Sequence, residues 1–185
     1  VVNGGFTNGL NGWSVEQFGS TSDGSGIVQG GSGYASFSLL TSDALTSPYA
    51  DISQTVDLTD VDTIYFDTYG VVLEGSVSDR VLYVYVGGII KSYTISQLGT
   101  SGWTTQSIDV SGLSGNQNLR FSTSLGGDYY GSTRGVGIRI ADVSAYAEKL
   151  TLDFTAYPTS GNPPLDVQFS ISGQNIQNVV WDFGD

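Results

Sequence analysis

The sequence predicts an all-β protein in which short antiparallel strands pack as a sandwich or a barrel. Apolar residues recur at every second position in many short segments, which is the period of a half-buried strand. Clusters of Gly, Ser, Asn and Asp separate these segments, and such residues favour turns. Glycine accounts for 26 of the 185 residues while only 13% are charged, a composition that disfavours long helices.

The predicted strands follow one another at short intervals. In the segment 64–69, Ile64 and Phe66 alternate with Tyr65, Asp67 and Tyr69, so one face would enter a core and the other would point outward. The same alternation predicts strands at 34–39, 52–58, 81–86 and 119–124. A single helical turn at 95–98 is the only helical candidate. Turn-rich sequence between the strands favours an antiparallel sandwich or barrel.

The composition excludes several function classes. The chain has no His and no Cys, which rules out Ser–His and Cys–His nucleophiles, thiolate or imidazole zinc sites, and disulfides. Nucleotide-binding and hydrolase motifs are absent, so we expect no enzymatic activity. The net charge of −12 argues against nucleic acid as a partner. No apolar run approaches the ~20 residues of a membrane span, so no membrane insertion is expected.

The same counts indicate an exported protein. An acidic, Cys-free chain rich in Gly, Ser, Thr and Tyr is typical of the extracellular space or the cell surface. There is no Met, even at position 1, which suggests a processed mature start or an excised fragment. Three of the four prolines fall within 158–164. The change in composition near 147–151 predicts two domains, residues 1–148 and 149–185.

Four motifs in order characterise the first domain. They are NGGFT with GLNGW at 3–13, SQTVDL at 53–58, GWTT at 102–105 and IRIADVS at 138–144. Together they resemble the jelly-roll carbohydrate-binding modules, which are galactose-binding-like β-sandwiches of many secreted glycosidases. The resemblance implies an antiparallel jelly-roll β-sandwich over residues 1–148 that binds a glycan and has no catalysis of its own. Many members of the family only mediate contact between proteins.

The tail carries a second set of motifs, namely FTAYP at 154–158, PLDVQFS at 164–170 and VWDFGD at 180–185. These resemble the start of a PKD domain, a small immunoglobulin-like β-sandwich of surface-layer proteins and secreted hydrolases. The resemblance implies three strands, 152–157, 165–170 and 176–183, without the rest of the domain. Unpaired strands of this kind would favour self-association with a second chain.

The first resemblance also implies a structural Ca²⁺ site between the first and last strands. Asp142 matches the acidic residue of the closing strand, but Ala141 replaces a second acidic residue, and Thr7 stands where Glu is usual. The remaining ligands would be the Thr7 hydroxyl and backbone oxygens, including one near Gly33. The alternative is an empty site in which neighbouring amides bind Asp142. A separate acidic cluster at 57–62 is better explained as a solvated turn.

Tyrosines and arginines form the candidate ligand site. Tyr83 and Tyr85 lie opposite the aliphatic positions of their segment, as do the outward residues of 64–69. If the strands were neighbours in one sheet, one outer face would carry Tyr65, Asp67, Tyr69, Tyr83, Tyr85, Arg120 and Arg139. Such a face suits sugar rings and hydroxyls. It would equally suit another surface protein, or have no partner.

Two adjacent tyrosines, Tyr129 and Tyr130, lie in the loop 126–131 and could add a contact at its tip. Trp13 and Trp103 are expected to pack in the core or at its edge. The sequence thus predicts a non-catalytic extracellular recognition module for carbohydrate or a cell surface. Two alternatives stay open: a structural or adhesive surface protein that uses the same faces for protein contact, and an accessory module of a secreted hydrolase.

Overall fold

The computed structural model describes residues 1–18, 28–40, 49–72, 81–124, 135–147, 152–173 and 178–182. The chain divides into two compact units, Val1–Ala147 and Glu148–Asp185, at the place where the composition changes. Over the described ranges every regular element is a β-strand. No described helix is long and apolar enough to cross a membrane. The all-β prediction is confirmed.

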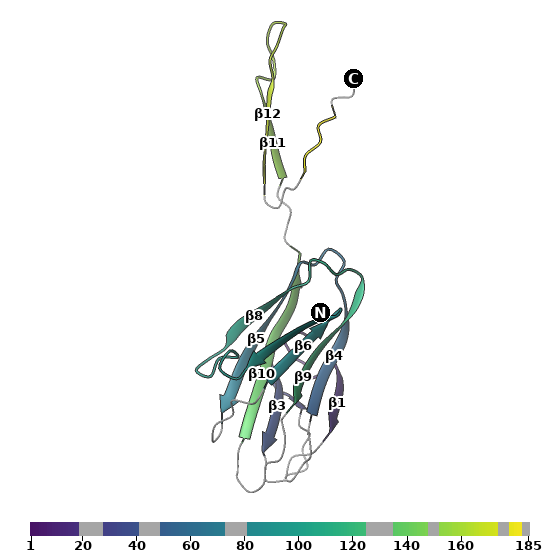
Figure 1. The fold of residues 1–185 in the computed structure, drawn as a ribbon, viewed down its shortest axis with the longest axis vertical. Coiled ribbons are helices and arrows are strands. Elements are labelled where there is room, and N and C mark those ends of the chain that lie inside the picture. Colours follow the sequence, from purple (N-terminus) through teal and green to yellow (C-terminus); the bar gives the residue numbers. More distant parts are fainter. Residues whose placement is uncertain are drawn as a thin grey trace. The chain divides into compact units, whose positions relative to one another are not determined.

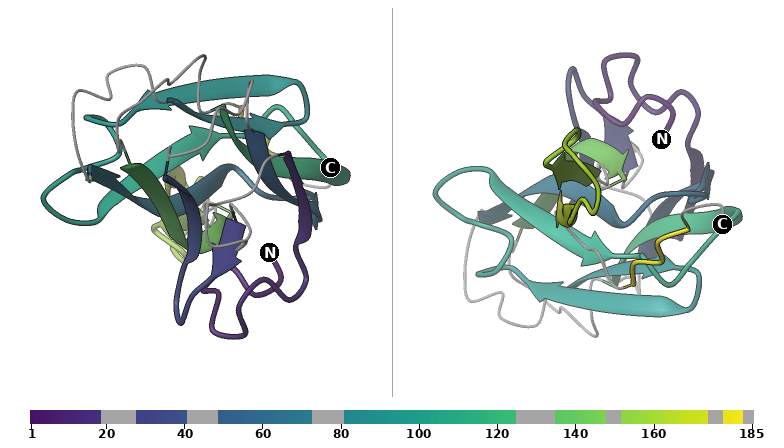
Figure 2. Two further views of the ribbon diagram at one scale, coloured as in Figure 1. Left: turned by 90° about the horizontal axis from the view of Figure 1, so that it is seen from below. Right: turned by 90° about the horizontal axis from the view of Figure 1, so that it is seen from above.

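Unit 1 consists of two five-stranded antiparallel sheets (Figures 1 and 2). The first sheet has the order β1-β4-β9-β6-β7, with strands Ser14–Phe18, Tyr49–Asp57, Asn116–Ser124, Val81–Val86 and Ile89–Thr94. The second has the order β2-β3-β10-β5-β8, with strands Val28–Gly30, Ala35–Leu40, Gly135–Tyr146, Thr63–Val72 and Thr104–Asp109.

The core of unit 1 is built from the inward positions of both sheets. Phe66 on β5 and Phe121 on β9 meet edge to face, with ring centroids 5.1 Å apart, and both are fully buried. Val84 is equally buried on β6, as the alternating pattern predicted. Trp13 stacks on Phe6 at 5.3 Å and is 7% exposed, which confirms its predicted place in the core.

The N-terminal segment closes the sandwich against the irregular part of β10. The register of β10 with β5 shifts between Ala141 and Ser144, where Asp142 has φ of +49°. There the amide of Val143 donates to the carbonyl oxygen of Gly4 at 3.0 Å. A Cβ on residue 4 would collide with the Val143 carbonyl oxygen, so Gly4 is required for this close approach.

Unit 2 contains one antiparallel pair, β11 (Leu152–Tyr157) and β12 (Gln168–Gly173). The first of these has the predicted bounds, whereas the second begins three residues later than the predicted 165. The predicted third strand is not found over the described residues 178–182. Trp181 contacts Phe154 and Phe169 through their rings and is 41% exposed. The likeness to a PKD domain therefore stays a resemblance.

Candidate functional site

The predicted site residues lie on two opposite outer faces. Tyr65, Asp67 and Tyr69 belong to β5 in the second sheet, where Arg139 is on β10; Tyr83, Tyr85 and Arg120 are on β6 and β9 in the first sheet. The predicted single face of four tyrosines is therefore wrong. The cause is that the chain crosses from one sheet to the other between β5 and β6. Alternation along a strand distinguishes inside from outside, but it does not assign the strand to a sheet.

On the outer face of the first sheet, Tyr85 and Arg120 are paired. They are opposite each other in the β6–β9 register, and Arg120 is also opposite Ser53 on β4. The Arg120 Cζ lies 4.1 Å from the centroid of the Tyr85 ring, which is a cation–π distance. The guanidinium therefore stacks over one face of the Tyr85 ring, so a polar and an apolar group lie together.

Asp51 holds the guanidinium in this position. Arg120 Nη1 lies 3.2 Å from Asp51 Oδ2, with side-chain exposures of 40% and 9% respectively. The other carboxylate oxygen, Oδ1, is buried and has no hydrogen-bond partner among the described residues. Asp51 engages only one nitrogen of Arg120, so the remaining N–H groups are available as donors.

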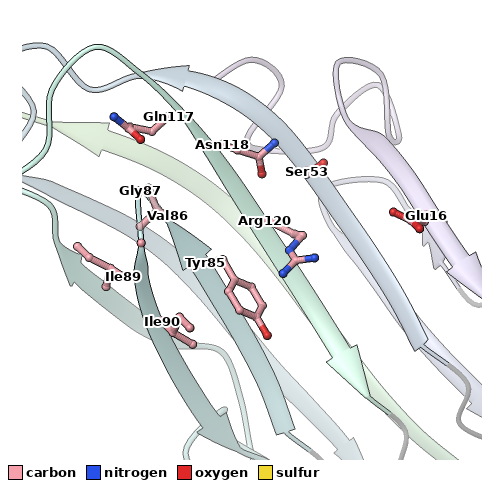
Figure 3. A pocket seen from close by; sticks show the side chains of 11 residues that line it. Glu16, Ser53, Tyr85, Val86, Gly87, Ile89, Ile90, Gln117, Asn118 and Arg120 are labelled. Atoms are coloured by element: carbon pink, nitrogen blue, oxygen red, sulfur yellow. The ribbon is translucent and has the colours of Figure 1, made fainter.

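A shallow pocket of about 590 Å³ opens beside this pair (Figure 3). Gln117 and Asn118 on β9 line it together with Tyr85 and Arg120, and Glu16 lines it from β1. Ile90, at 61% exposure, adds an apolar side chain from β7. An aromatic ring surrounded by amide, carboxylate and guanidinium groups can stack on the C–H face of a pyranose and bind its hydroxyls.

Two further tyrosines contact residues that line the pocket. Tyr83 lies beside Tyr85, with ring centroids 6.3 Å apart. Tyr49 on β4 donates its hydroxyl to Glu16 Oε1 at 3.2 Å, and this carboxylate raises the pKa of Tyr49 above its usual value. The sequence analysis did not find Glu16 or Asp51. Their relevance depends on the β1–β4–β9 pairing, which no local pattern shows.

The outer face of the second sheet holds a separate aromatic cluster. Arg139 Cζ lies 4.8 Å from the ring centroid of Tyr34 and 5.7 Å from that of Tyr69. The Trp103 ring contacts Tyr34 and Tyr69 at 6.3 and 5.9 Å. Trp103 is 46% exposed, so it is not a core residue and lies on the outer face instead. Tyr34 was not predicted as a site residue, although it is the first residue of the predicted strand 34–39, because no motif distinguishes it.

The other predicted residues of this face lie beyond that cluster. Asp67 Oδ1 accepts a hydrogen bond from Thr105 Oγ1 at 2.6 Å. Tyr65 is 39% exposed and meets Tyr146 edge to face at 5.8 Å. The predicted loop residues Tyr129 and Tyr130 are outside the described residues.

The segments of the predicted Ca²⁺ site do meet. Asp142 Oδ1 lies beside Gly5, and the amide of Gly33 donates to the carbonyl oxygen of Phe6 at 3.3 Å. Thr7 follows directly and is exposed. Asp142 is the only carboxylate of the predicted ligand set, and the described residues contain no group of three or more acidic side chains placed to hold a metal ion. This set fits Ca²⁺ only if backbone oxygens and water complete the six to eight ligands it needs.

Comparison with known proteins supports the fold. No protein-family model and no curated protein match the sequence. Among solved structures, a carbohydrate-binding module of family 61 in complex with β-1,4-galactotriose matches with a TM-score of 0.52 and 21% identity, over 80% of this chain and 97% of that module. Modules of families 4 and 28 match with TM-scores of 0.44 and 0.43 at 14% and 12% identity. They cover 79% and 78% of this chain, and 98% and 93% of their own. The match to the family 61 module shows that the chain shares the β-sandwich fold of that module.

Proposed function

We propose that the protein is a non-catalytic recognition module that binds carbohydrate in the pocket on the outer face of the first sheet. The observation that carries this proposal is the Tyr85–Arg120 pair, fixed by Asp51 at the edge of an open, polar pocket. The ring supplies the flat apolar surface that a pyranose stacks on. The guanidinium and the neighbouring amides supply donors and acceptors for hydroxyl groups.

A neutral galacto-oligosaccharide is the first ligand to test. The family 61 module with a similar fold was solved with β-1,4-galactotriose, which makes this sugar a suitable probe. The pocket contains the Glu16 carboxylate and an arginine already paired with Asp51, so one negative charge is left uncompensated. Such a pocket disfavours an anionic ligand and accepts an uncharged one.

The test is a titration of the whole chain with β-1,4-galactotriose, followed calorimetrically, together with a glycan array. Tyr85→Ala should abolish measurable binding. Tyr157→Ala, which removes an 80% exposed tyrosine from unit 2, should leave the affinity unchanged. If no glycan binds, or if Tyr85→Ala binds as well as wild type, the pocket is not a carbohydrate site.

The wider biological role belongs to the same proposal. We propose an extracellular location, at the cell surface or in an accessory module of a secreted hydrolase. The absence of Cys and the strongly acidic composition support this. A structural or adhesive surface protein is the second candidate, favoured by the exposed aromatic residues on both faces, which would then contact protein. If the wild-type protein binds no glycan but binds cells through these faces, the result would favour the structural or adhesive role.

Calcium is proposed as a structural ion beside Asp142. The meeting of the Gly5–Thr7 turn, Gly33 and the β10 irregularity supports it. Because an ion that binds only the native state stabilises it by mass action, we expect Tm to fall on addition of EDTA and to recover with Ca²⁺. Asp142→Asn should remove this response. A melt that EDTA does not change, in protein reloaded with Ca²⁺, would contradict the proposal.

Self-association through unit 2 is proposed as a further contact. A two-stranded sheet is marginally stable alone, and the described part of unit 2 has one such sheet with apolar side chains exposed. A second copy of this chain could cover them by strand addition.

A further inference from the structure

The second sheet carries an arginine that lies over two aromatic rings, and a third ring packs against those two. Arg139 projects from β10, where it is opposite Tyr69 on β5 and Ser36 on β3. Its guanidinium lies over the Tyr34 and Tyr69 rings, and Trp103 packs against both rings. This cluster lies in the other layer of the sandwich from the pocket around Tyr85. It therefore constitutes a separate surface and does not depend on the proposed function.

The two outward arginines differ in how their charge is balanced. Arg120 forms an ion pair with Asp51 at 3.2 Å. Arg139 has no ion pair with any carboxylate among the described residues, and its close neighbours are aromatic rings. Among the described residues, the strands of this face carry Asp67 and Asp109, which accept hydrogen bonds from the Thr105 and Ser111 hydroxyls. Over the described residues, Arg139 thus carries a positive charge that no carboxylate pairs within ion-pair distance, whereas Arg120 is paired.

This environment pre-organises Arg139 for an anion. Contacts with the Tyr34 and Tyr69 rings restrict the guanidinium, so less side-chain entropy is lost when a planar carboxylate binds its N–H groups side by side. The half-exposed indole of Trp103 lies at the edge of the cluster and offers a surface for the C–H face of a sugar ring. A ligand that uses both groups must combine a pyranose ring with a carboxylate.

We propose that the Tyr34–Tyr69–Trp103–Arg139 cluster is a second binding site, selective for an acidic sugar such as a uronic acid. Arg139 binds the sugar carboxylate, and Trp103 stacks on the ring. The protein would then carry a neutral-sugar site on one face and an acidic-sugar site on the other. Because the whole protein is acidic, densely charged polyanions are repelled at long range, whereas screening within ~8 Å at physiological salt permits a short acidic segment to bind.

The test compares trigalacturonate with its methyl ester, which keeps the rings and removes the charges. Wild-type protein should bind the acid about tenfold more tightly than the ester, and added salt should weaken this binding. Arg139→Gln should remove the preference for the acid. Trp103→Ala should weaken the binding of both forms. Because Trp103 is half exposed, this substitution tests the cluster without removing a core side chain, even if Arg139→Gln fails to fold.

Two variants of the opposite face separate this proposal from the proposed function. Arg120→Gln and Tyr85→Ala should leave trigalacturonate binding unchanged, while Arg139→Gln should leave galactotriose binding unchanged. The proposal is overturned if trigalacturonate does not bind at roughly millimolar concentration, if the ester binds equally well, or if Tyr85→Ala abolishes binding of the acid. Failure of galactotriose to bind would affect only the pocket on the first sheet.

Discussion

At the scale of single residues, the pocket depends on one nearly buried carboxylate. Alternation along β9 predicted that Arg120 points outward, and it does. The same rule could not identify its partner, because Asp51 and Ile52 are neighbours on β4 and both are buried. Asp51 can be recognised as the partner of Arg120 only when β4 and β9 are known to be neighbours.

We therefore predict that Asp51→Asn weakens both folding and binding. The substitution removes the charge that holds the half-exposed guanidinium over Tyr85, so we expect a loss of about 1 kcal/mol in the free energy of unfolding. A similar loss in binding corresponds to about fivefold weaker affinity for galactotriose. Denaturant unfolding and calorimetry measure the two effects. Asp60→Asn, at an exposed turn residue with φ of +58° that Asn tolerates, is the matched control. Equal affinity for wild type and Asp51→Asn would show that Asp51 does not position Arg120.

Acidic turn residues should give a second, pH-dependent effect. Asp109 Oδ1 accepts hydrogen bonds from the Ser111 hydroxyl and amide at 2.6 and 2.9 Å, and these lower the pKa of Asp109 below 3.8. A lowered pKa in the folded state adds stability above the unfolded pKa, and this stability is lost as pH falls through the folded pKa. Ser111→Ala should therefore destabilise the protein at neutral pH and lose its effect in strong acid.

The carboxyl of Asp109, followed by NMR, should titrate at higher pH in Ser111→Ala than in wild type. Ser107→Ala, at an exposed position of the adjacent strand β8, is the control and should change neither quantity. A destabilisation of the same size at neutral and strongly acidic pH would mean that the serine acts without the charge of Asp109. Asp57 and Thr59 repeat this arrangement, which supports the prediction that the acidic cluster at 57–62 is a turn.

At the scale of elements, the sequence predicted the strands better than their arrangement. The segments 64–69 and 81–86 lie within β5 and β6, with the predicted positions buried. Their assignment to opposite sheets arises from long-range pairing: β5 lies between β10 and β8, and β6 between β9 and β7. The loop after β7 had no predicted role either, yet it leads directly to Trp103.

Glycine 99 fixes this loop. It has φ of +80°, its carbonyl oxygen accepts the amide of Gly70 at 2.8 Å, and a Cβ here would collide with Thr104. Gly99→Ala should therefore cost about 1–3 kcal/mol in the free energy of unfolding and displace Trp103, changing the fluorescence of the protein. Gly102→Ala has open space around its Cβ and should stay within about 0.5 kcal/mol of wild type. Equal stability of the two variants would show that the loop relaxes around residue 99.

At the scale of the whole molecule, the two units differ in how they bury apolar surface. Among the described residues, the buried hydrophobic core belongs to unit 1 and lies between the two sheets. The described large apolar side chains of unit 2 stay partly or mostly exposed, including Tyr157 at 80%, Phe154 at 65% and Val180 at 90%. Burial of a large side chain is worth roughly 1.5–3 kcal/mol, so covering this surface would release several kcal/mol. The sequence motifs predicted β11. They did not predict how the following residues pack, because a single pair of strands does not determine which residues those side chains contact.

If a second copy covers that surface, the full chain should associate reversibly. The weight-average mass in sedimentation equilibrium should then rise with protein concentration. Val180→Ser and Trp181→Ser should each hold the protein closer to a monomer, because they remove apolar area from the shared face. Tyr146→Ser, which removes a 59% exposed side chain from unit 1, should associate like wild type. Wild-type protein that stays monomeric at every concentration would exclude the second copy. Association that persists unchanged in Val180→Ser and Trp181→Ser would place the contact outside unit 2, on one of the aromatic faces of the sandwich.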